Sequence, residues 1–375
     1  MSSSFTGSSP LAAYGWDDAL EHEFTSHRAA GLIPARVAAV DRGLCDVVTE
    51  NGPARASTGP VLSAGSSGSA GSGGDRSAAP CTGDWAALRP GGPDGRPAVA
   101  ALLPRRTAIV RSSASRDSRG QVLAANVDTV AVAVSLAAPL DLGRIERLLA
   151  LAWESGARPV VVLTKADRVP DAAGERAGVA AEVAAAAPGV DVVACSAATG
   201  EGVEAVRAVL PGTVVLVGPS GAGKSTLGNA LLGAEALATG AVREADGKGR
   251  HTTVRRELLP LPGGGVLIDT PGLRGVGLFE ASQGLERAFA DVEELAARCR
   301  FGDCAHESEP GCAVLEAIED GALPRRRLDS YRKLMRENAW AASRTDQRLR
   351  AERENRTKAI SRWQRQMYRE RGRDR

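Results

Sequence analysis

The sequence predicts a multidomain protein: a small all-β barrel or sandwich near the N-terminus, a central α/β domain and a mostly helical C-terminal part. Three observations lead to this prediction. Short β-like runs separated by Gly and Pro occupy much of residues 35–113, which is typical of a small β-domain. From about residue 121, apolar strand-sized runs alternate with helix-sized segments, which indicates a parallel sheet covered on both faces. Beyond about residue 283 the pattern becomes helical and then increasingly basic.

The composition allows a sizeable core in a chain of two- or three-domain length. Of the 375 residues, 43% are hydrophobic and 25% are charged, which is near the average for globular proteins. Aromatic residues make up only 3%, so the core must consist mainly of Val, Leu and Ala. The chain has no apolar run of about 18 residues, and its polar start, MSSSFTGSSP, lacks the pattern of a signal peptide. We therefore expect a cytoplasmic protein without a membrane partner.

The charge is distributed unevenly along the chain. The whole sequence has a net charge of only +2, but residues 324–375 contain eighteen Arg or Lys against seven Asp or Glu. Such a strongly basic end indicates a polyanionic partner, although a merely solvated helix is the alternative.

The patterns divide the chain into five regions. An N-terminal extension, 1–30, contains a short helical segment at Trp16–Phe24. The β-domain spans 31–115 and is interrupted by a flexible Gly/Ser-rich insertion, 57–80, which is too poor in apolar side chains to build a core. The central α/β domain spans 116–282, the C-terminal domain 283–345, and a basic tail 346–375. Within the central domain we expect strands at 127–136, 158–167, 190–197 and 212–218, and helices at 141–156, 172–187 and 202–209.

A phosphate-binding loop follows the last of these strands. The stretch GPSGAGKS, residues 218–225, fits the pattern G-x-x-x-x-G-K-[ST], with a strand before it and a helix-compatible segment after it. Its glycines let backbone N–H groups turn towards phosphates, Lys224 reaches the β- and γ-phosphates, and Ser225 binds Mg²⁺. The predicted nucleotide contacts in this loop are Gly218, Pro219, Ser220, Gly221, Ala222, Gly223, Lys224, Ser225 and Thr226.

Two further motifs indicate that the base is guanine. TKAD, Thr164–Asp167, resembles the guanine motif [NT]-K-x-D, in which Asp167 accepts two hydrogen bonds from the base and Lys165 lies along its ring. Adenine offers neither donor, so a P-loop kinase or ATPase is the weaker alternative. In CSAATGEG, Ser196 and Ala197 resemble the motif whose backbone N–H meets the guanine oxygen. Thr164 departs from the commoner Asn, which alters one contact.

The γ-phosphate is expected to be sensed by two later segments. DTPG, residues 269–272, resembles the D-x-x-G switch, in which Asp269 holds Mg²⁺ through water and the Gly272 N–H meets the γ-phosphate. In GRHTT, residues 249–253, either Thr253 or Thr252 completes the Mg²⁺ site. Together the motifs predict a GTPase that uses Mg²⁺ with GTP.

The motifs occur in an unusual order. The guanine motifs precede the phosphate loop and both switches, which predicts a circularly permuted GTPase domain. The chain that follows Gly272 is therefore joined directly to a segment that moves with the γ-phosphate.

The C-terminal domain contains a cluster of metal-binding residue types. The spacing C-x4-C-x-H-x5-C provides four ligands for tetrahedral zinc, and four protein ligands leave no open position for catalysis. We therefore predict one structural zinc ion per chain, held by Cys299, Cys304, His306 and Cys312.

Together, the barrel, the permuted GTPase and the Cys3His motif resemble the RsgA (YjeQ) family of ribosome small-subunit-dependent GTPases. Further matching stretches are LPRRT (103–107), QVLAANVDTV (121–130), GRHTT (249–253) and RLDSYRKLMRE (327–337). The resemblance covers about residues 30–340. It implies an OB-fold barrel, a GTPase that acts late in 30S assembly and the 30S subunit with its 16S rRNA as partners. We expect a monomer.

The resemblance also implies roles for individual residues. His251 is expected to position the attacking water, with Lys224 and Thr253 as the other catalytic residues, because Leu273 stands where Ras-like proteins have a Gln. Candidate rRNA contacts are Arg105, Arg106, Arg111 and the cluster 325–327. The alternatives are a permuted GTPase that serves the large subunit and a zinc-containing RNA-binding scaffold that is switched by the nucleotide.

Overall fold

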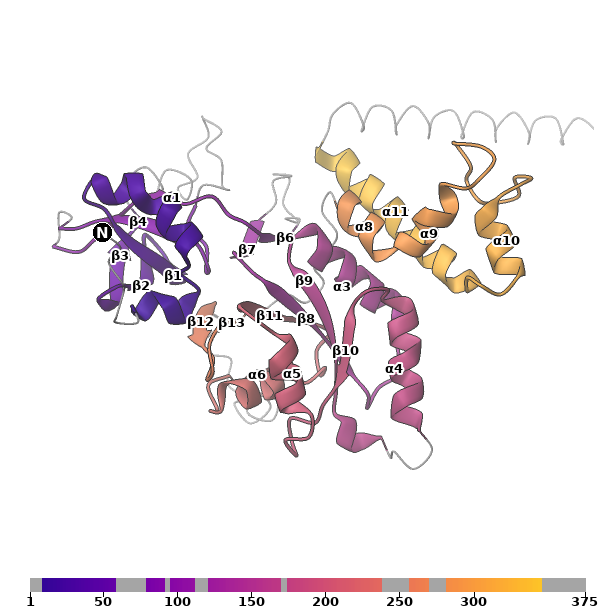
Figure 1. Ribbon diagram of the computed structural model, residues 1–375, viewed down its shortest axis with the longest axis horizontal. Coiled ribbons are helices and arrows are strands. Elements are labelled where there is room, and N and C mark those ends of the chain that lie inside the picture. Colours follow the sequence, from indigo (N-terminus) through magenta and orange to yellow (C-terminus); the bar gives the residue numbers. More distant parts are fainter. Residues whose placement is uncertain are drawn as a thin grey trace, which may run out of the picture.

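The computed structural model describes residues 9–58, 79–91, 95–111, 121–169, 174–237, 256–269 and 281–345. Three parts follow one another across the molecule: a barrel, a central α/β sheet and a helical C-terminal part (Figure 1). This architecture confirms the predicted fold class. Most of the Gly/Ser-rich insertion and the whole basic tail lie outside the described residues. Within the described ranges, no helix has both the length and the apolar character needed to cross a membrane.

The N-terminal part is a closed five-stranded barrel with a short helical cover. Its strands are β1 (Ile33–Asp41), β2 (Leu44–Thr49), β3 (Gly52–Ser57), β4 (Trp85–Arg89) and β5 (Ala98–Leu102), in the order β1-β2-β3-β5-β4. Helices η1 (Pro10–Tyr14) and α1 (Asp18–Ala29) precede them, and the side chains of Leu11 and Phe24 pack with Trp85 over the barrel. The barrel interior contains small side chains such as Ala35 and Val37. A small barrel filled in this way agrees with the scarcity of aromatic residues.

One predicted barrel strand lies elsewhere. Residues 106–113 were expected to extend the barrel, but β6 (Ala108–Arg111) pairs only with β7 (Gln121–Ala125) in a separate two-stranded sheet. That expectation is wrong because the strand packs on the central part of the molecule. The side chain of Ile109 is buried in the central core, and the Ala108 N–H donates to the Ser155 carbonyl at 3.1 Å. Arg111 therefore lies outside the barrel.

The turn before β4 joins the barrel to the central sheet. The fully buried carboxylate of Asp84 accepts two hydrogen bonds from the Arg105 guanidinium, at 2.7 and 2.8 Å, and Arg105 also donates to the Ala79 carbonyl. Arg105 thus has a structural role within the protein. The Thr82 hydroxyl donates to the carbonyl of Arg256 at 3.4 Å, directly before the edge strand of the sheet.

The central sheet has six strands in the order β10-β9-β8-β11-β13-β12. Five of them are parallel: β8 (Thr129–Ser135), β9 (Arg158–Thr164), β10 (Asp191–Ala194), β11 (Thr213–Val217) and β13 (Val266–Asp269). The edge strand β12 (Glu257–Pro260) is antiparallel to β13. The strands are Val-rich and mostly buried, as expected for a sheet covered on both faces.

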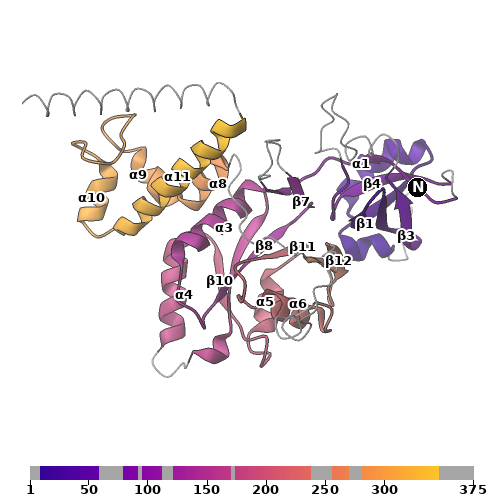
Figure 2. The ribbon, with the colours of Figure 1, turned by 180° about the vertical axis from the view of Figure 1, so that it is seen from behind.

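Helices cover both faces of this sheet (Figures 1 and 2). On one face α3 (Leu142–Glu154) and α4 (Glu175–Ala186) pack against side chains such as Val130 and Val132. On the other face α5 (Val203–Val209) and α6 (Lys224–Leu232) pack against Ala131 and Val160. A short 3-10 helix, η3 (Ala166–Arg168), follows β9. The alternation of strands and helices predicted for residues 121–232 is confirmed.

The C-terminal part consists of α8 (Ser282–Ala288), α9 (Ala290–Ala296), α10 (Ala313–Glu319) and the long α11 (Arg325–Thr345). It rests on α3 of the central sheet (Figure 1). Helices α8 and α3 are so close that a side-chain carbon on Gly284 would lie 2.1 Å from the Ala150 carbonyl oxygen. Only glycine fits at this crossing.

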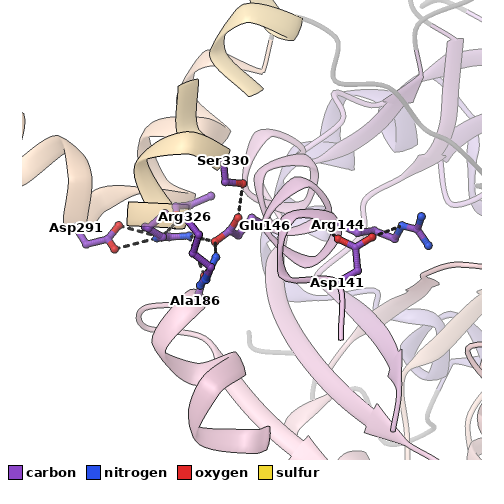
Figure 3. A network of polar contacts seen from close by, with 9 residues as sticks. Asp141, Arg144, Glu146, Ala186, Asp291, Arg326 and Ser330 are labelled. Atoms are coloured by element: carbon purple, nitrogen blue, oxygen red, sulfur yellow. Dashed lines mark hydrogen bonds and ion pairs between the residues drawn. The ribbon is translucent and has the colours of Figure 1, made fainter. Parts of the chain in front are cut away.

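A buried polar network joins α11 to the helices of the sheet (Figure 3). The carboxylate of Glu146 on α3 is fully buried and accepts hydrogen bonds from Arg326, Arg327 and Ser330. The Arg327 guanidinium also makes two hydrogen bonds of 2.9 Å to Asp291 on α9. Because the Arg327 side chain is only 1% exposed, the expectation that Arg327 contacts RNA is wrong. A run of three arginines does not reveal that its third member faces the interior.

Candidate functional site

The phosphate loop lies at the carboxyl edge of the sheet, between β11 and α6. Gly218 begins the loop with φ near +144°, and a side-chain carbon there would lie 2.5 Å from the Ala133 carbonyl oxygen. A glycine is therefore required where the loop passes β8. Helix α6 begins at Lys224, whose Nζ donates to the carbonyls of Gly218 and Pro219 at 2.8 and 2.7 Å. These bonds hold the lysine ammonium at the loop that is predicted to bind phosphates.

The predicted guanine loop is bonded directly to the phosphate loop. The Thr164 hydroxyl donates to the Ala222 carbonyl at 2.7 Å, joining the end of β9 to the middle of GPSGAGKS. This bond gives a structural role to the threonine that replaces the commoner Asn. The next residue, Lys165, has a left-handed backbone with φ of 59°, which turns the chain into η3.

Asp167 and Ser196 come together from neighbouring strands. Strands β9 and β10 pair in parallel, so the loops that follow them lie side by side. The Ser196 hydroxyl donates to the Asp167 carboxylate at 2.7 Å, and this bond is the main reason that the pKa of Asp167 lies below its usual value. The Ser196 N–H donates to the Glu201 carbonyl at 2.8 Å. Asp167 therefore stays ionised at neutral pH and is an acceptor for two N–H groups of a base.

Asp269 ends β13, next to the phosphate-loop strand. Because Val215 of β11 pairs with Ile268 of β13, Asp269 lies at the same sheet edge as the phosphate loop. Its carboxylate and the hydroxyl of Ser225, the second residue of α6, are the hard oxygen donors that Mg²⁺ prefers. The predicted site residues His251, Thr252, Thr253 and Gly272, together with Leu273, lie outside the described residues.

A cavity of about 320 Å³ adjoins the phosphate loop on the side of α3. Residues 219–222 of the loop and Lys165 form one wall, and Asp141 and Arg144 at the start of α3 line another. These two residues were not predicted as part of the site, because their only local signal is that of a helix start. Asp141 is indeed the N-cap of α3 and accepts the Arg144 N–H at 3.0 Å.

The four predicted zinc ligands meet between α9 and α10. All ligand atoms of Cys299, Cys304, His306 and Cys312 lie within 4.8 Å of one another. The Sγ atoms of Cys299 and Cys312 are 3.8 Å apart, and the Nδ1 of His306 lies 3.6 and 3.4 Å from them. Tetrahedral zinc with bonds of about 2.3 Å to sulfur and about 2.0 Å to nitrogen requires edges of about 3.8 and 3.5 Å. The observed distances fit that geometry.

Burial favours the neutral, metal-binding form of His306, and Glu309 fixes the loop that carries this histidine. Burial lowers the pKa of His306 below its usual value, which favours the neutral imidazole that binds metals. Glu309, within the spacer before Cys312, accepts the backbone N–H groups of Ala305, Glu307 and Ser308 at 2.7 to 3.0 Å. These N–H groups lower the pKa of Glu309 to about 2. Glu309 was not predicted as part of the site, because spacer residues have no motif of their own.

The arrangement defines the class of protein. A phosphate loop that follows the guanine motifs in the chain lies beside them in the sheet, as in a circularly permuted GTPase. Two solved structures share the fold: YjeQ from Thermotoga maritima (TM-score 0.60, 24% identity, covering 82% of this chain and 98% of that one) and YloQ, described as a circularly permuted GTPase (TM-score 0.57, 21% identity, 82% and 94%).

Sequence comparison identifies the family. The sequence model of the RsgA GTPase family matches residues 102–279. The protein named small ribosomal subunit biogenesis GTPase RsgA of Streptomyces coelicolor is 59% identical over 351 residues, which cover 93% of this chain and 92% of the relative. Its namesake from Opitutus terrae is 44% identical over 375 residues, covering 97% and 99%. The chain belongs to the RsgA family and is a GTP hydrolase, as the motifs predicted.

Proposed function

We propose that this chain hydrolyses GTP to GDP and phosphate during late maturation of the small (30S) ribosomal subunit, and that the subunit stimulates the reaction. Two hydrogen bonds support the nucleotide specificity: the bond from Ser196 to Asp167 joins the two guanine motifs, and the bond from Thr164 to Ala222 joins TKAD to the phosphate loop. The relatives described above, named for small-subunit biogenesis, support the ribosomal role.

Guanine is selected at its hydrogen-bonding edge. Asp167 accepts the N1–H and 2-amino groups of the base, while the stem of Lys165 covers the ring. Because the Ser196 N–H is already engaged by Glu201, the Ala197 N–H is the donor left in this motif for the guanine oxygen. Adenine would offer the Asp167 carboxylate neither of these two base N–H donors, and such a mismatch gives large discrimination.

The phosphates are bound by the loop of residues 218–226. Its backbone N–H groups and Lys224 balance the negative charge of the β- and γ-phosphates. Ser225, Asp269 and either Thr253 or Thr252 would hold Mg²⁺, which when bound would supply positive charge to balance that of the phosphates. The Gly272 N–H fixes the γ-phosphate, and His251 orients the attacking water as a neutral donor or acceptor.

Zinc has a structural role in this proposal. The Cys3His cluster takes one Zn²⁺ per chain, and its four protein ligands leave no position for a substrate. The metal would link Cys299, which follows α9, to Cys312 at the start of α10.

The protein acts in the cytoplasm as a monomer that binds 16S rRNA through the barrel, the zinc module and the basic tail. Arg111 remains a candidate for a phosphate contact, as do the half-exposed Arg106, Arg325 and Arg326. Arg105 and Arg327 instead stabilise the joints between the parts of the molecule.

Turnover of GTP with and without purified 30S subunits tests this function. We expect low basal hydrolysis, strong stimulation by 30S but not by 50S subunits, and no hydrolysis of ATP. His251→Ala should lose the stimulation while it still binds GTP, whereas Leu273→Gln should raise the basal rate. Stimulation by 50S subunits would instead favour a large-subunit factor. Absence of turnover under all conditions would favour an RNA-binding scaffold switched by the nucleotide.

A further inference from the structure

Asn338 of α11 holds the first described residues after the DTPG segment. Its side-chain Oδ1 accepts the Ala281 N–H at 2.8 Å, and its Nδ2 donates to the Ser282 hydroxyl at 3.2 Å. Asn338 is 6% exposed and Ala281 only 1%. Helix α8 begins at Ser282 and has no side-chain cap from its own sequence, because Ala281 is its N-cap residue. A residue far along the chain therefore holds this helix start.

The same helix start is fixed from the opposite side by the central sheet. The Gly284 N–H donates to the Glu154 carboxylate of α3 at 2.7 Å, and Gly284 lies against the backbone of Ala150. Helix α8 thus begins between α3, which covers the nucleotide-binding sheet, and α11, which leads to the basic tail.

The contact of Asn338 with Ala281 lies close in sequence to the DTPG motif. Only residues 270–280 separate Asp269, at the nucleotide edge of the sheet, from Ala281. Residues 269–272 form the DTPG motif, whose Gly272 N–H is assigned to the γ-phosphate. Strand β13 fixes the chain at Asp269, and Asn338 fixes it at Ala281, the next described residue.

We propose that Asn338 is a positioning residue for GTP hydrolysis: by binding Ala281 and Ser282 it fixes the point at which the DTPG segment rejoins the fold, and so makes hydrolysis depend on the position of α11. The proposal rests on the GTPase function given above. Fixing the position of Ala281 limits the positions from which the preceding chain can present a backbone N–H to the γ-phosphate. Rotation or displacement of α11 by a partner would shift this fixed point.

Loss of the Asn338 bonds should affect the rate of GTP hydrolysis but not the affinity for the nucleotide. The base and the α- and β-phosphates are bound by residues 164–167, 196–197 and 218–226, none of which contacts Asn338. Loss of the Asn338 bonds should therefore lower kcat in the presence of 30S subunits while the affinity for GDP stays unchanged. A merely structural role would instead lower thermal stability without a selective effect on kcat.

The test compares three variants by 30S-stimulated hydrolysis, by titration with a fluorescent GDP and by amide exchange of Ala281. We expect Asn338→Ala to lower the stimulated kcat by about tenfold, because a buried N–H loses its acceptor, and to leave the GDP affinity within about twofold. Amide exchange at Ala281 should become faster. Asn338→Asp keeps an acceptor for Ala281 and should restore most of kcat.

Glu337→Gln is the matched control. Glu337 is the neighbouring residue on α11, but its carboxylate pairs with Arg147 of α3. It should retain the stimulated kcat. A normal stimulated kcat in Asn338→Ala, or an equal loss of kcat in Glu337→Gln, would overturn the proposal. If Asn338→Ala fails to fold, Asn338→Ser replaces it with the same expectations. A wild-type protein that does not hydrolyse GTP would instead contradict the proposed function.

Discussion

Replacing Arg327 by methionine tests the buried network between the sheet and the C-terminal helices. The guanidinium makes five hydrogen bonds: one to Glu146, two to Asp291 and one each to the carbonyls of Ala186 and Ala288. It also lies 4.2 Å from the ring centre of Phe289. Methionine replaces much of the side-chain volume but none of the donors.

The expected loss in the free energy of unfolding depends on whether each former hydrogen-bond partner of Arg327 finds a new partner. Asp291, with a side chain 28% exposed, regains water, and Glu146 keeps its bonds to Arg326 and Ser330. The two backbone carbonyls are on buried residues and lose their donor, at about 1–3 kcal/mol each. We therefore expect Arg327→Met to lower the free energy of unfolding of the C-terminal part by about 3–5 kcal/mol, the usual range for a broken buried ion pair.

Urea denaturation of the zinc-loaded protein, followed by circular dichroism and tryptophan fluorescence, measures this change. Arg325→Met is the matched control, because it makes the same chemical change two residues away at a side chain that is 56% exposed and only 3.5 Å from Asp329. The control should cost less than about 1 kcal/mol. If both variants lose the same free energy, the buried network does not stabilise the joint and the reasoning fails.

Four further predictions concern the nucleotide, metal and RNA sites. Asp167→Asn should lose GTP affinity and gain xanthosine triphosphate binding in titrations. The Ser196 hydroxyl lowers the pKa of Asp167 in the wild type. The wild-type affinity for GTP should therefore persist through mildly acidic pH and fall only as the pH drops through that lowered pKa. Metal analysis should find about one zinc per wild-type chain and none in Cys304→Ser, which should still bind GTP. Glu309→Gln should release zinc faster to a chelator, because the loop N–H groups lose a charged acceptor; an unchanged release rate would contradict the assigned role. Deleting the residues after Glu354 should flatten the salt dependence of ribosome binding by a log–log slope of roughly 0.7–0.9 per lost phosphate contact.

Features specified by short, local sequence patterns were predicted correctly. The phosphate loop requires a strand, a glycine-rich turn and a helix in succession, and residues 213–232 provide all three. The Cys3His spacing likewise brings its ligands together within one short loop. The permuted order was evident because each motif is recognisable in isolation, and the sheet order of β8 to β13 agrees with it.

Features that depend on residues distant in sequence were not predicted. The local sequence does not show what pairs with the buried carboxylate of Glu146, because its partners Arg326 and Arg327 lie on α11, far along the chain. Asn338 follows a recognised family stretch but has no local signal for a contact across 57 residues. The alternating pattern around Ile109 is the same for a barrel strand and for a strand on the central core, so its location depends on what packs against it.

The fixed ends of the Gly/Ser-rich insertion have a practical consequence. On one side the Thr58 N–H donates to the Gly43 carbonyl at 3.1 Å, and on the other the Ala79 carbonyl accepts a hydrogen bond from Arg105. Since both ends are held by the barrel itself, its closure does not depend on how many residues connect them, and each doubling of that length costs only about 0.6 kcal/mol of chain entropy. We therefore expect the barrel to tolerate changes in length between Thr58 and Ala79, which makes this segment a suitable place to insert an affinity tag.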